Sequence, residues 1–341
     1  MRCVPGGLLG AAQGTAGGAG LRRGGWSTDR VPSVGLCLSA TGAPAMQEDP
    51  QDPGVAVIGL GVMGAALARV QLEAGASVHV WNRSPEKAEP LVALGARACD
   101  SAREAVAASR IVIVCLADYD AWRELRAAQA LDAQLADRVV VQLTTGTRED
   151  AREDVARTRA AGALALDGVI LAFPRQIGTT EGMILLAGDE AAWEAAAGVL
   201  GAFGREVHYL GEDPDLPCVL DAAILAAALG TLVGTLNGAA LAEAGGVAPQ
   251  TYARLLAGAA HLQSDEAARM LTAVAEDRTD ETEAALGTWA KIPGLMAELG
   301  REMGVDTGYA DWLARCFERA EAAGLADHDL SAMIGLLRPK H

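Results

Sequence analysis

The sequence predicts an α/β fold, in which a doubly wound parallel sheet is followed by an all-helical C-terminal domain, and two observations predict it. From residue 55 onward, short apolar runs alternate with helical patterns, which is typical of parallel strands joined by crossover helices. After residue 212 the strand patterns stop and only helical patterns follow. We therefore expect a sheet domain over residues 54–212 and a helical domain over residues 213–338.

Short apolar runs, most of them rich in β-branched residues, are the expected strands. They cover residues 55–59, 77–81, 111–115, 138–143, 164–170, 183–187 and 206–210. A helix covers residues 190–202, and further helical patterns begin near Val62, Pro85, Ser101, Asp120 and Arg148. Because parallel strands need crossover connections, this alternation predicts one sheet with helices on both faces.

Residues 1–53 are rich in Gly, Ala and Ser and have little apolar periodicity, so no folded segment is expected there. They favour a disordered leader, or an over-extended start with Met46 as the true first residue. A transit peptide is the alternative that the early arginines leave open.

Composition narrows the class of function. The net charge of −16 argues against nucleic acid and anionic membranes as partners, because both are themselves negative. Six cysteines are scattered without C-x-x-C or zinc-ligand spacing, which fits a reduced cytoplasm and predicts no metal site.

The first helix of the second half, residues 216–244, is long and apolar enough to raise the question of a membrane span. Asp221 and Asn237 lie inside the run and basic residues do not flank it, so a buried inter-domain or dimer helix is favoured. Gly230, Gly234 and Gly238 recur every four residues and predict one face against which another helix can pack closely.

A glycine-rich turn between the first strand and the first helix has the spacing G-x-G-x-x-G and indicates a Rossmann-type dinucleotide site. Gly59 permits the sharp turn, Gly61 lets the backbone approach a pyrophosphate, and Gly64 lets the helix and strand pack closely. The phosphates would bind the free N–H groups at the helix N-terminus. The alternative is a purely structural strand–helix turn. The expected contacts of the cofactor in this turn are Gly59, Leu60, Gly61, Val62, Met63 and Gly64.

The end of the second strand selects the cofactor. NAD-binding folds carry an acid there for the ribose hydroxyl, whereas this chain has Asn82, Arg83 and Ser84, with Lys87 one turn later. Arg83 can pair with a 2′-phosphate, Ser84 can donate a hydrogen bond and Lys87 adds positive charge. The sequence therefore predicts NADPH, and the alternative is that Arg83 is a solvated surface charge.

The ends of later strands add further candidates. Thr144 and Thr145 follow the strand at 138–143, at the sheet edge where open α/β sheets bind ligands; the alternative is that they cap a turn. Cys115 is the last residue of the strand at 111–115 and Leu116 follows it, and both are also expected to contact the cofactor.

These features together resemble a known superfamily. The glycine turn with Met63, the Asn82-Arg83-Ser84 end and the helical second half resemble the β-hydroxyacid dehydrogenases. Over residues 55–338 the chain is similar to one branch, the NADPH-dependent imine reductases, in five stretches: residues 115–121, 142–147, 166–179, 209–214 and 328–338. The resemblance implies hydride transfer to an imine, or to a carbonyl plus amine, in a homodimer with interlocked helical domains.

The resemblance also assigns the catalytic position. The hydroxyacid dehydrogenases place a lysine early in the inter-domain helix, and the imine reductases an aspartate or a tyrosine; Asp221 fits the aspartate type. It would either protonate the imine nitrogen or stabilise the iminium cation. The alternative is an acid that only favours the helix dipole. The expected substrate pocket contains Tyr119, Phe173, Leu225 and Leu229.

Two rival functions remain at this point. A 3-hydroxyacid-type dehydrogenase would need a lysine-like acid in the long helix, but the chain has no lysine between Lys87 and Lys291. A non-catalytic NADPH-binding protein would bind the cofactor without turnover, and Asp221 would then be replaceable.

Overall fold

The computed structural model of the protein describes residues 54–339, and its contacts divide the chain into two compact units, Met1–Pro217 and Cys218–His341. The leader expected over residues 1–53 lies outside the described residues.

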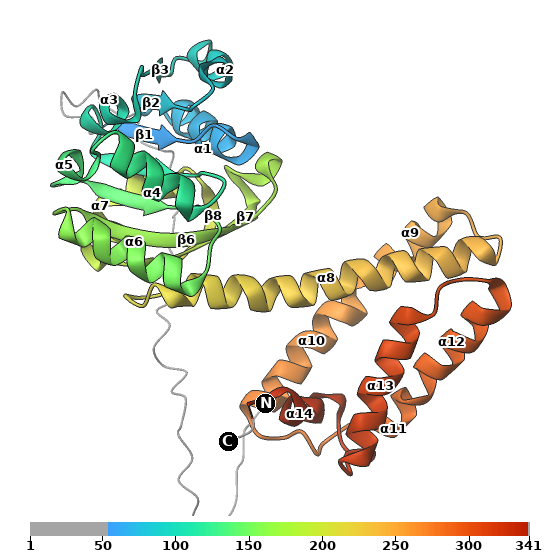
Figure 1. Ribbon diagram of the computed structural model, residues 1–341. Helices are drawn as coiled ribbons and strands as arrows, with labels where there is room; N and C mark the ends of the chain where they lie inside the picture. Colours follow the sequence, from blue (N-terminus) through green and yellow to red (C-terminus); the bar gives the residue numbers. More distant parts are fainter. Residues whose placement is uncertain (1–53, 340–341) are drawn as a thin grey trace, which may run out of the picture. The chain divides into compact units, whose positions relative to one another are not determined.

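The first unit is built on one sheet of eight strands in the order β3-β2-β1-β4-β5-β6-β7-β8 (Figure 1). All neighbours pair in parallel except β6 and β7, which are antiparallel. The strands are β1 (Val55–Ile58), β2 (Val78–Trp81), β3 (Arg97–Ala98), β4 (Ile111–Val114), β5 (Val139–Gln142), β6 (Leu164–Leu171), β7 (Thr179–Gly188) and β8 (Gly204–Tyr209).

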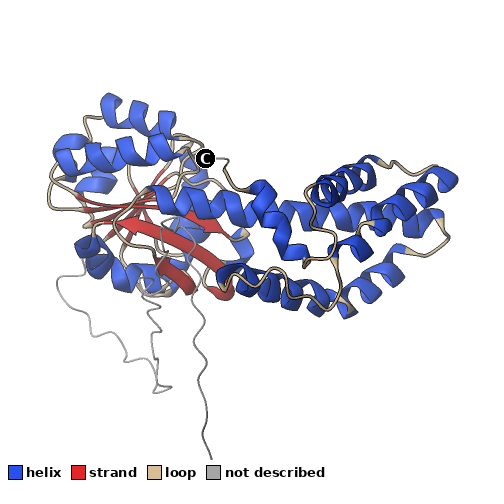
Figure 2. Ribbon diagram, turned by 90° about the horizontal axis from the view of Figure 1, so that it is seen from below, coloured by secondary structure: helices blue, strands red, loops and turns tan. Residues whose placement is uncertain are grey.

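Helices cover both faces of this sheet, as the red strands between blue helices in Figure 2 show. Alternate residues of β1 enter two separate cores: Val55 and Val57 pack in one, Ala56 and Ile58 in the other. Helices α1 (Val62–Glu73), α2 (Glu89–Val92) and α7 (Glu190–Gly201) contribute to the first core. The second core takes residues from α3 (Ala102–Ala107), α4 (Tyr119–Ala128) and α5 (Asp132–Leu135), and α6 (Arg148–Ala160) packs beside β6. Burial on both faces explains why the parallel strands are continuous apolar runs.

Every predicted strand is present, and the expected fold class is confirmed. β3 was not predicted, because it has only two residues, both exposed, and therefore no apolar pattern. The direction of β7 was also not evident. Only residues 172–178, with the short helix η3 (Pro174–Gln176), join β6 to β7, and a parallel crossover needs about a dozen residues or more.

The second unit is entirely helical over its described residues. Helix α8 (Asp215–Ala244) begins in the first unit and its residues from Cys218 onward belong to the second. The rest of this unit consists of α9 (Pro249–Gly258), α10 (Ala260–Ala275), α11 (Leu286–Trp289), α12 (Lys291–Met303), α13 (Gly308–Ala322), η4 (Leu330–Met333) and α14 (Ile334–Leu337).

The glycine face of α8 is contacted by tyrosines of its own unit. A Cβ on Gly234 would lie 2.8 Å from the Tyr309 hydroxyl, and one on Gly238 would lie 2.2 Å from the Tyr252 hydroxyl. The close approach that the glycines predicted therefore exists, but tyrosine side chains make it. A Cβ on Gly230 would meet no atom within 4 Å.

Within residues 54–339, α8 is the one helix long and apolar enough to cross a membrane, with a mean hydropathy of 2.1 over its most apolar window. Only 6% of that window is buried within this single chain. Length and composition alone are weak grounds for a span.

Candidate cofactor and active site

The glycine turn connects β1 to α1 and leaves space at one position only. Gly59 has φ +98°, and a Cβ there would lie 2.2 Å from the carbonyl oxygen of Cys115. A Cβ on Gly64 would lie 2.0 Å from the carbonyl oxygen of Gly59. A Cβ on Gly61, by contrast, would meet nothing within 4 Å. The outer side of the turn is thus open at the residue where a pyrophosphate would approach the backbone.

The N-terminus of α1 suits an anion. Gly61 is the N-cap and provides no side-chain hydrogen bond, and the first turn contains no acidic residue. The unbonded N–H groups and the positive end of the helix dipole are therefore not neutralised by the protein itself. Val62 is 79% exposed, whereas Leu60 is buried with 3% exposed.

Asn82 shapes the turn from the neighbouring strand. Its Oδ1 accepts a hydrogen bond from the Leu60 N–H at 2.9 Å, and its Nδ2 donates to the Ser84 carbonyl at 3.0 Å. The Leu60 N–H is therefore already hydrogen-bonded, and the Leu60 side chain is buried, so neither group is free to contact a ligand. Asn82 therefore fixes the turn through these two hydrogen bonds, and its expected contact with the cofactor stays a prediction.

The predicted 2′-phosphate site follows β2. Arg83 and Lys87 are exposed and Ser84 is half-buried. Within residues 54–339, neither Arg83 nor Lys87 forms an ion pair, so both positive charges are available to an anion. This arrangement leaves open the alternative of a solvated Arg83.

The loops after β4 and β5 are tied together at the same edge of the sheet. The Leu116 N–H donates to Thr144 Oγ1 at 3.1 Å, and the Thr144 N–H donates to Gln142 Oε1 at 3.0 Å. Thr144 is only 2% exposed and its hydroxyl joins the loops, whereas the Thr145 side chain is exposed. Burial raises the pKa of the Cys115 thiol to about 11, so the thiol is neutral at pH 7.

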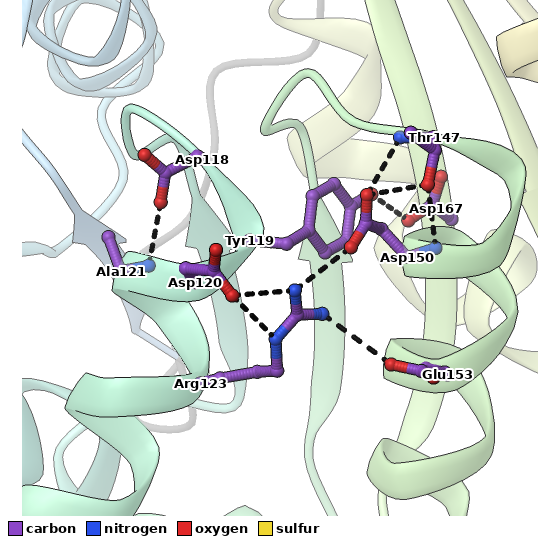
Figure 3. A network of polar contacts seen from close by, with 9 residues as sticks. All are labelled: Asp118, Tyr119, Asp120, Ala121, Arg123, Thr147, Asp150, Glu153 and Asp167. Carbon is purple, nitrogen blue, oxygen red and sulfur yellow. Dashed lines mark hydrogen bonds and ion pairs between the residues drawn. The ribbon is translucent and has the colours of Figure 1, made fainter.

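Tyr119 lies beneath these loops and points into the unit. Its side chain is 3% exposed, and its hydroxyl donates to Asp167 Oδ2 at 2.5 Å (Figure 3). A Cβ on Gly146 would lie 2.4 Å from the ring, so the β5–α6 loop packs directly on the tyrosine. The Tyr119 hydroxyl therefore has a partner inside this unit, and the expected place of Tyr119 in the substrate pocket stays a prediction.

Phe173, also expected in the substrate pocket, is 61% exposed at the end of β6. The guanidinium of Arg175 lies 4.7 Å from the centre of its ring, in cation–π geometry.

Asp221 lies in the second turn of α8 and shares one face of the helix with Leu225 and Leu229, at i, i+4 and i+8. The two leucines are 41% and 57% exposed. Asp221 forms no hydrogen bond or ion pair with any described residue, and burial raises the pKa of its carboxyl. This face lies roughly opposite the glycine face that the two tyrosines contact.

Sequence reasoning missed Asp167, Gly146 and Gln142. Asp167 carried a usable signal, since it is an acid within the apolar run of β6 and a buried acid needs a partner. Gly146 and Gln142 lie in a stretch that carries the family resemblance, residues 142–147, but their contacts depend on which loops the topology brings together. Three or more His, Cys, Asp or Glu side chains placed to bind a metal ion occur nowhere in residues 54–339.

An open glycine turn at a helix N-terminus, basic residues after the second strand and a doubly wound sheet define a dinucleotide-binding oxidoreductase domain. Comparisons with family models agree. Residues 54–211 match the NAD-binding domain of 6-phosphogluconate dehydrogenase, and residues 213–339 match the C-terminal domain of NADPH-dependent reductive aminase-like proteins.

Solved structures extend the similarity over both units. An imine reductase from Myxococcus stipitatus in complex with NADP+ is 32% identical, with a TM-score of 0.79 over 84% of this chain and 100% of that one. A reductive aminase from Aspergillus terreus in complex with NADPH4, cyclohexanone and allyl amine is 29% identical, with a TM-score of 0.77 over 84% of this chain and 100% of that one.

Among curated proteins, the NADPH-dependent reductive aminase of Aspergillus oryzae is 34% identical over 196 residues, which span 56% of this chain and 64% of that protein's length. The chain belongs to the imine reductase and reductive aminase family of NADP-dependent oxidoreductases.

Proposed function

We propose that the protein is an NADPH-dependent reductase of C=N bonds, in which Asp221 is the acidic group of the active site. The observation that carries this proposal is the carboxyl of Asp221, which has no partner among residues 54–339 and lies in α8, a helix that contains no lysine or arginine. Reduction of a ketone builds up negative charge on oxygen and is served by a cationic acid such as lysine. Reduction of an iminium instead starts from a cation and removes its positive charge. A carboxylate beside the substrate stabilises that cation.

The first unit has the residues to hold NADPH. In the turn from Gly59 to Gly64, the N–H groups at the start of α1 would bind the pyrophosphate, and Arg83, Ser84 and Lys87 would bind the 2′-phosphate. Cys115, Leu116 and Thr145 would line the edge along which the rest of the cofactor extends, with Thr144 holding that edge together. When bound, NADPH supplies the hydride.

Asp221 can act in two ways. As a carboxylate it stabilises the iminium cation, and as a carboxylic acid it protonates the imine nitrogen. The burial that raises the pKa of Asp221 favours the second form relative to an exposed aspartate. Leu225 and Leu229 add apolar surface to the same face of α8.

The substrates we propose are imines, and carbonyl compounds together with amines. The Aspergillus terreus relative was solved with a ketone and an amine bound. The reductive aminases that this sequence resembles add a tyrosine about two turns after the catalytic aspartate, and this chain has Leu229 in that region. We therefore propose preformed imines as the better substrates.

We further propose a homodimer with interlocked helical domains, located in the cytoplasm. The support for the dimer is the apolar surface that α8 exposes in a single chain. The support for the cytoplasm is that the cysteines Cys99, Cys115 and Cys316 have free thiols.

The decisive experiment compares wild type with Asp221→Asn in NADPH oxidation on a panel of small cyclic imines. We expect turnover to fall at least about tenfold in the variant while the Kd for NADPH stays unchanged, because Asn keeps the shape and removes the ionisable proton. Glu243→Gln, near the other end of α8, is the matched control and should retain full turnover.

Other outcomes would redirect the proposal. Full activity of Asp221→Asn would reduce Asp221 to a residue that favours the helix dipole. Absence of imine turnover by the wild type, with NADPH bound, would contradict the proposed reaction, and oxidation of 3-hydroxyacids with NADP+ would then be measured.

A further inference from the structure

A buried tyrosine–aspartate pair lies under the cofactor edge and has no role in the function proposed so far. Tyr119 is the first residue of α4, and Asp167 lies in β6 between Gln142 of β5 and Ala187 of β7. Both side chains are 3% exposed, and one hydrogen bond of 2.5 Å joins the phenol to Asp167 Oδ2.

The pair is attached to both loops that face the cofactor. Tyr119 directly follows the β4–α4 loop, residues 115–118, whose last residue Asp118 caps α4 by accepting from the Ala121 N–H at 2.7 Å. The other loop, residues 143–147, packs Gly146 against the tyrosine ring. The hydrogen bond to Asp167 therefore fastens the ring, and through it both loops, to the centre of the sheet.

The surroundings of Asp167 favour its protonated form. The groups that face it are Tyr119 from α4 and Asp150 and Asp154 from α6, and no cation pairs with Asp167 among the described residues. Asp150 is paired with Arg123 at 3.0 Å (Figure 3), and Asp154 with Arg126 at 3.0 Å. Burial first, and then these two acids, raise the pKa of Asp167 to about 8, so it holds its proton at neutral pH.

We propose that Tyr119 and Asp167 are positioning residues, which hold the loops after β4 and β5 in the geometry that binds NADPH. The proposal rests on the proposed function, because it takes these loops to be the cofactor edge. Neither residue contacts the reacting atoms in this role. Their hydrogen bond sets the affinity for the cofactor rather than the chemical step.

The test measures NADPH binding directly, by fluorescence titration of the full chain without substrate. Tyr119→Phe removes the donor and leaves Asp167 buried without its partner, so we expect the Kd for NADPH to rise about tenfold. The KM for NADPH should rise in parallel, while kcat at saturating NADPH changes less than about twofold.

Asp167→Asn is the conservative variant. Its side-chain oxygen can still accept from Tyr119, and the residue it replaces is protonated at pH 7, so we expect an NADPH affinity close to that of wild type. In wild type the affinity should fall as the pH rises through about 8, because the bound cofactor is anionic and disfavours ionisation of Asp167. Asp167→Asn should lack this fall.

Tyr209→Phe is the matched control. The Tyr209 hydroxyl also donates one hydrogen bond, to the Gly188 carbonyl at 2.8 Å, but it lies on β8 and away from both loops. It should lose some thermal stability and keep its NADPH affinity.

Each result is decisive. Unchanged NADPH affinity in Tyr119→Phe, or equal losses in Tyr119→Phe and Tyr209→Phe, would overturn the positioning role. Failure of wild type to bind NADPH would instead overturn the proposed function, and the two failures are therefore distinguishable.

Discussion

The three glycines of the turn have different physical tasks, and single atoms separate them. A Cβ on Gly59 or Gly64 would lie only 2.2 or 2.0 Å from a backbone oxygen, so the fold requires glycine at both positions. Gly61 faces open space, so its lack of a side chain serves a ligand. Stability and cofactor binding should therefore respond to different glycines.

For Gly61→Ala we expect the free energy of unfolding to stay within about 0.5 kcal/mol of wild type, since its φ of −64° suits any residue. The Kd for NADPH should rise about tenfold or more, because the new methyl occupies the approach of the pyrophosphate. Urea unfolding and fluorescence titration measure the two quantities. Gly64→Ala should instead lower the free energy of unfolding by at least about 1–3 kcal/mol. Equal stability losses in both variants would contradict this division.

Arg83 decides between the two cofactors if its free guanidinium meets the 2′-phosphate. We expect Arg83→Ala to raise the Kd for NADPH about tenfold or more, the value of one charged hydrogen bond, and to change the Kd for NADH less than about twofold. Arg205→Ala, another exposed arginine of the same unit, is the control and should change neither. Equal increases in the Kd for NADPH and the Kd for NADH would show that Arg83 does not recognise the 2′-phosphate.

Asp167 also makes the stability of the protein depend on pH, with a sign that can be worked out. Its pKa is about 8 in the fold and near 3.8 in the unfolded chain, so between these values the folded state holds a proton that the unfolded state lacks. The free energy of unfolding of wild type, relative to Asp167→Asn, should therefore fall as the pH rises from about 4 to about 8 and then stay constant. Urea titrations at pH 5, 7 and 9 measure it. A difference that does not change with pH would show that Asp167 titrates normally.

At this scale the sequence could supply residue types but not their partners. Gly59, Gly61 and Arg83 follow from spacing along the chain. The roles of Asn82 and Thr144 required the structure, because their hydrogen bonds reach residues 22 and 28 positions away. Tyr119 illustrates the same limit, since nothing local indicates that its hydroxyl reaches a strand 48 residues later.

Among the elements, the packing of α4 against α6 depends on a buried arginine. Arg126 has no exposed side-chain surface and contacts Asp132 at 2.6 Å, Asp154 at 3.0 Å and Thr158 at 2.9 Å. Its guanidinium also lies 5.6 Å from the centre of the Trp122 ring. A helix–helix contact that is usually apolar is here charged.

Arg126→Met should lower the free energy of unfolding by about 3–5 kcal/mol, because it leaves the carboxylate of Asp154 buried and unpaired. Replacing both residues, in Arg126→Met with Asp154→Leu, should recover part of this loss. Chemical denaturation followed by circular dichroism measures both. Arg97→Met breaks an exposed pair with Glu104 and should cost about 1 kcal/mol or less. A similar cost for the two arginines would contradict the buried-pair argument.

The positions of the helices and strands were more predictable from the sequence than the contacts of single residues. Strands buried on both faces are continuous apolar runs, so their positions follow from the sequence. Helix α6 also begins where its capping residues place it, with Thr147 and Asp150 forming a capping box. The presence of β3 and the antiparallel direction of β7 were not predictable, because they depend on tertiary context and connection length.

At the scale of the whole molecule, α8 raises the question of what covers it. Leu225, Leu229, Leu232, Val233 and Leu236 are all at least 41% exposed, in a helix whose most apolar window has a mean hydropathy of 2.1. A single soluble chain rarely leaves such a stripe uncovered, and a second copy of the chain is the occupant we propose. The composition of the chain alone could not assign it, since a membrane span and a dimer helix have the same apolar content.

Wild type should therefore sediment as a dimer of about 70 kDa, twice the chain mass of 35.0 kDa. Leu232→Glu with Leu236→Glu places two charges on the stripe, and we expect a chain of monomer mass, because burying each unpaired charge costs several kcal/mol. Val92→Glu with Leu94→Glu charges comparably exposed apolar residues of the first unit and should leave the mass unchanged. Analytical ultracentrifugation without detergent separates the possibilities. A wild-type monomer that reduces imines would contradict the dimer, and wild type that sediments only with lipid vesicles would assign the stripe to a membrane.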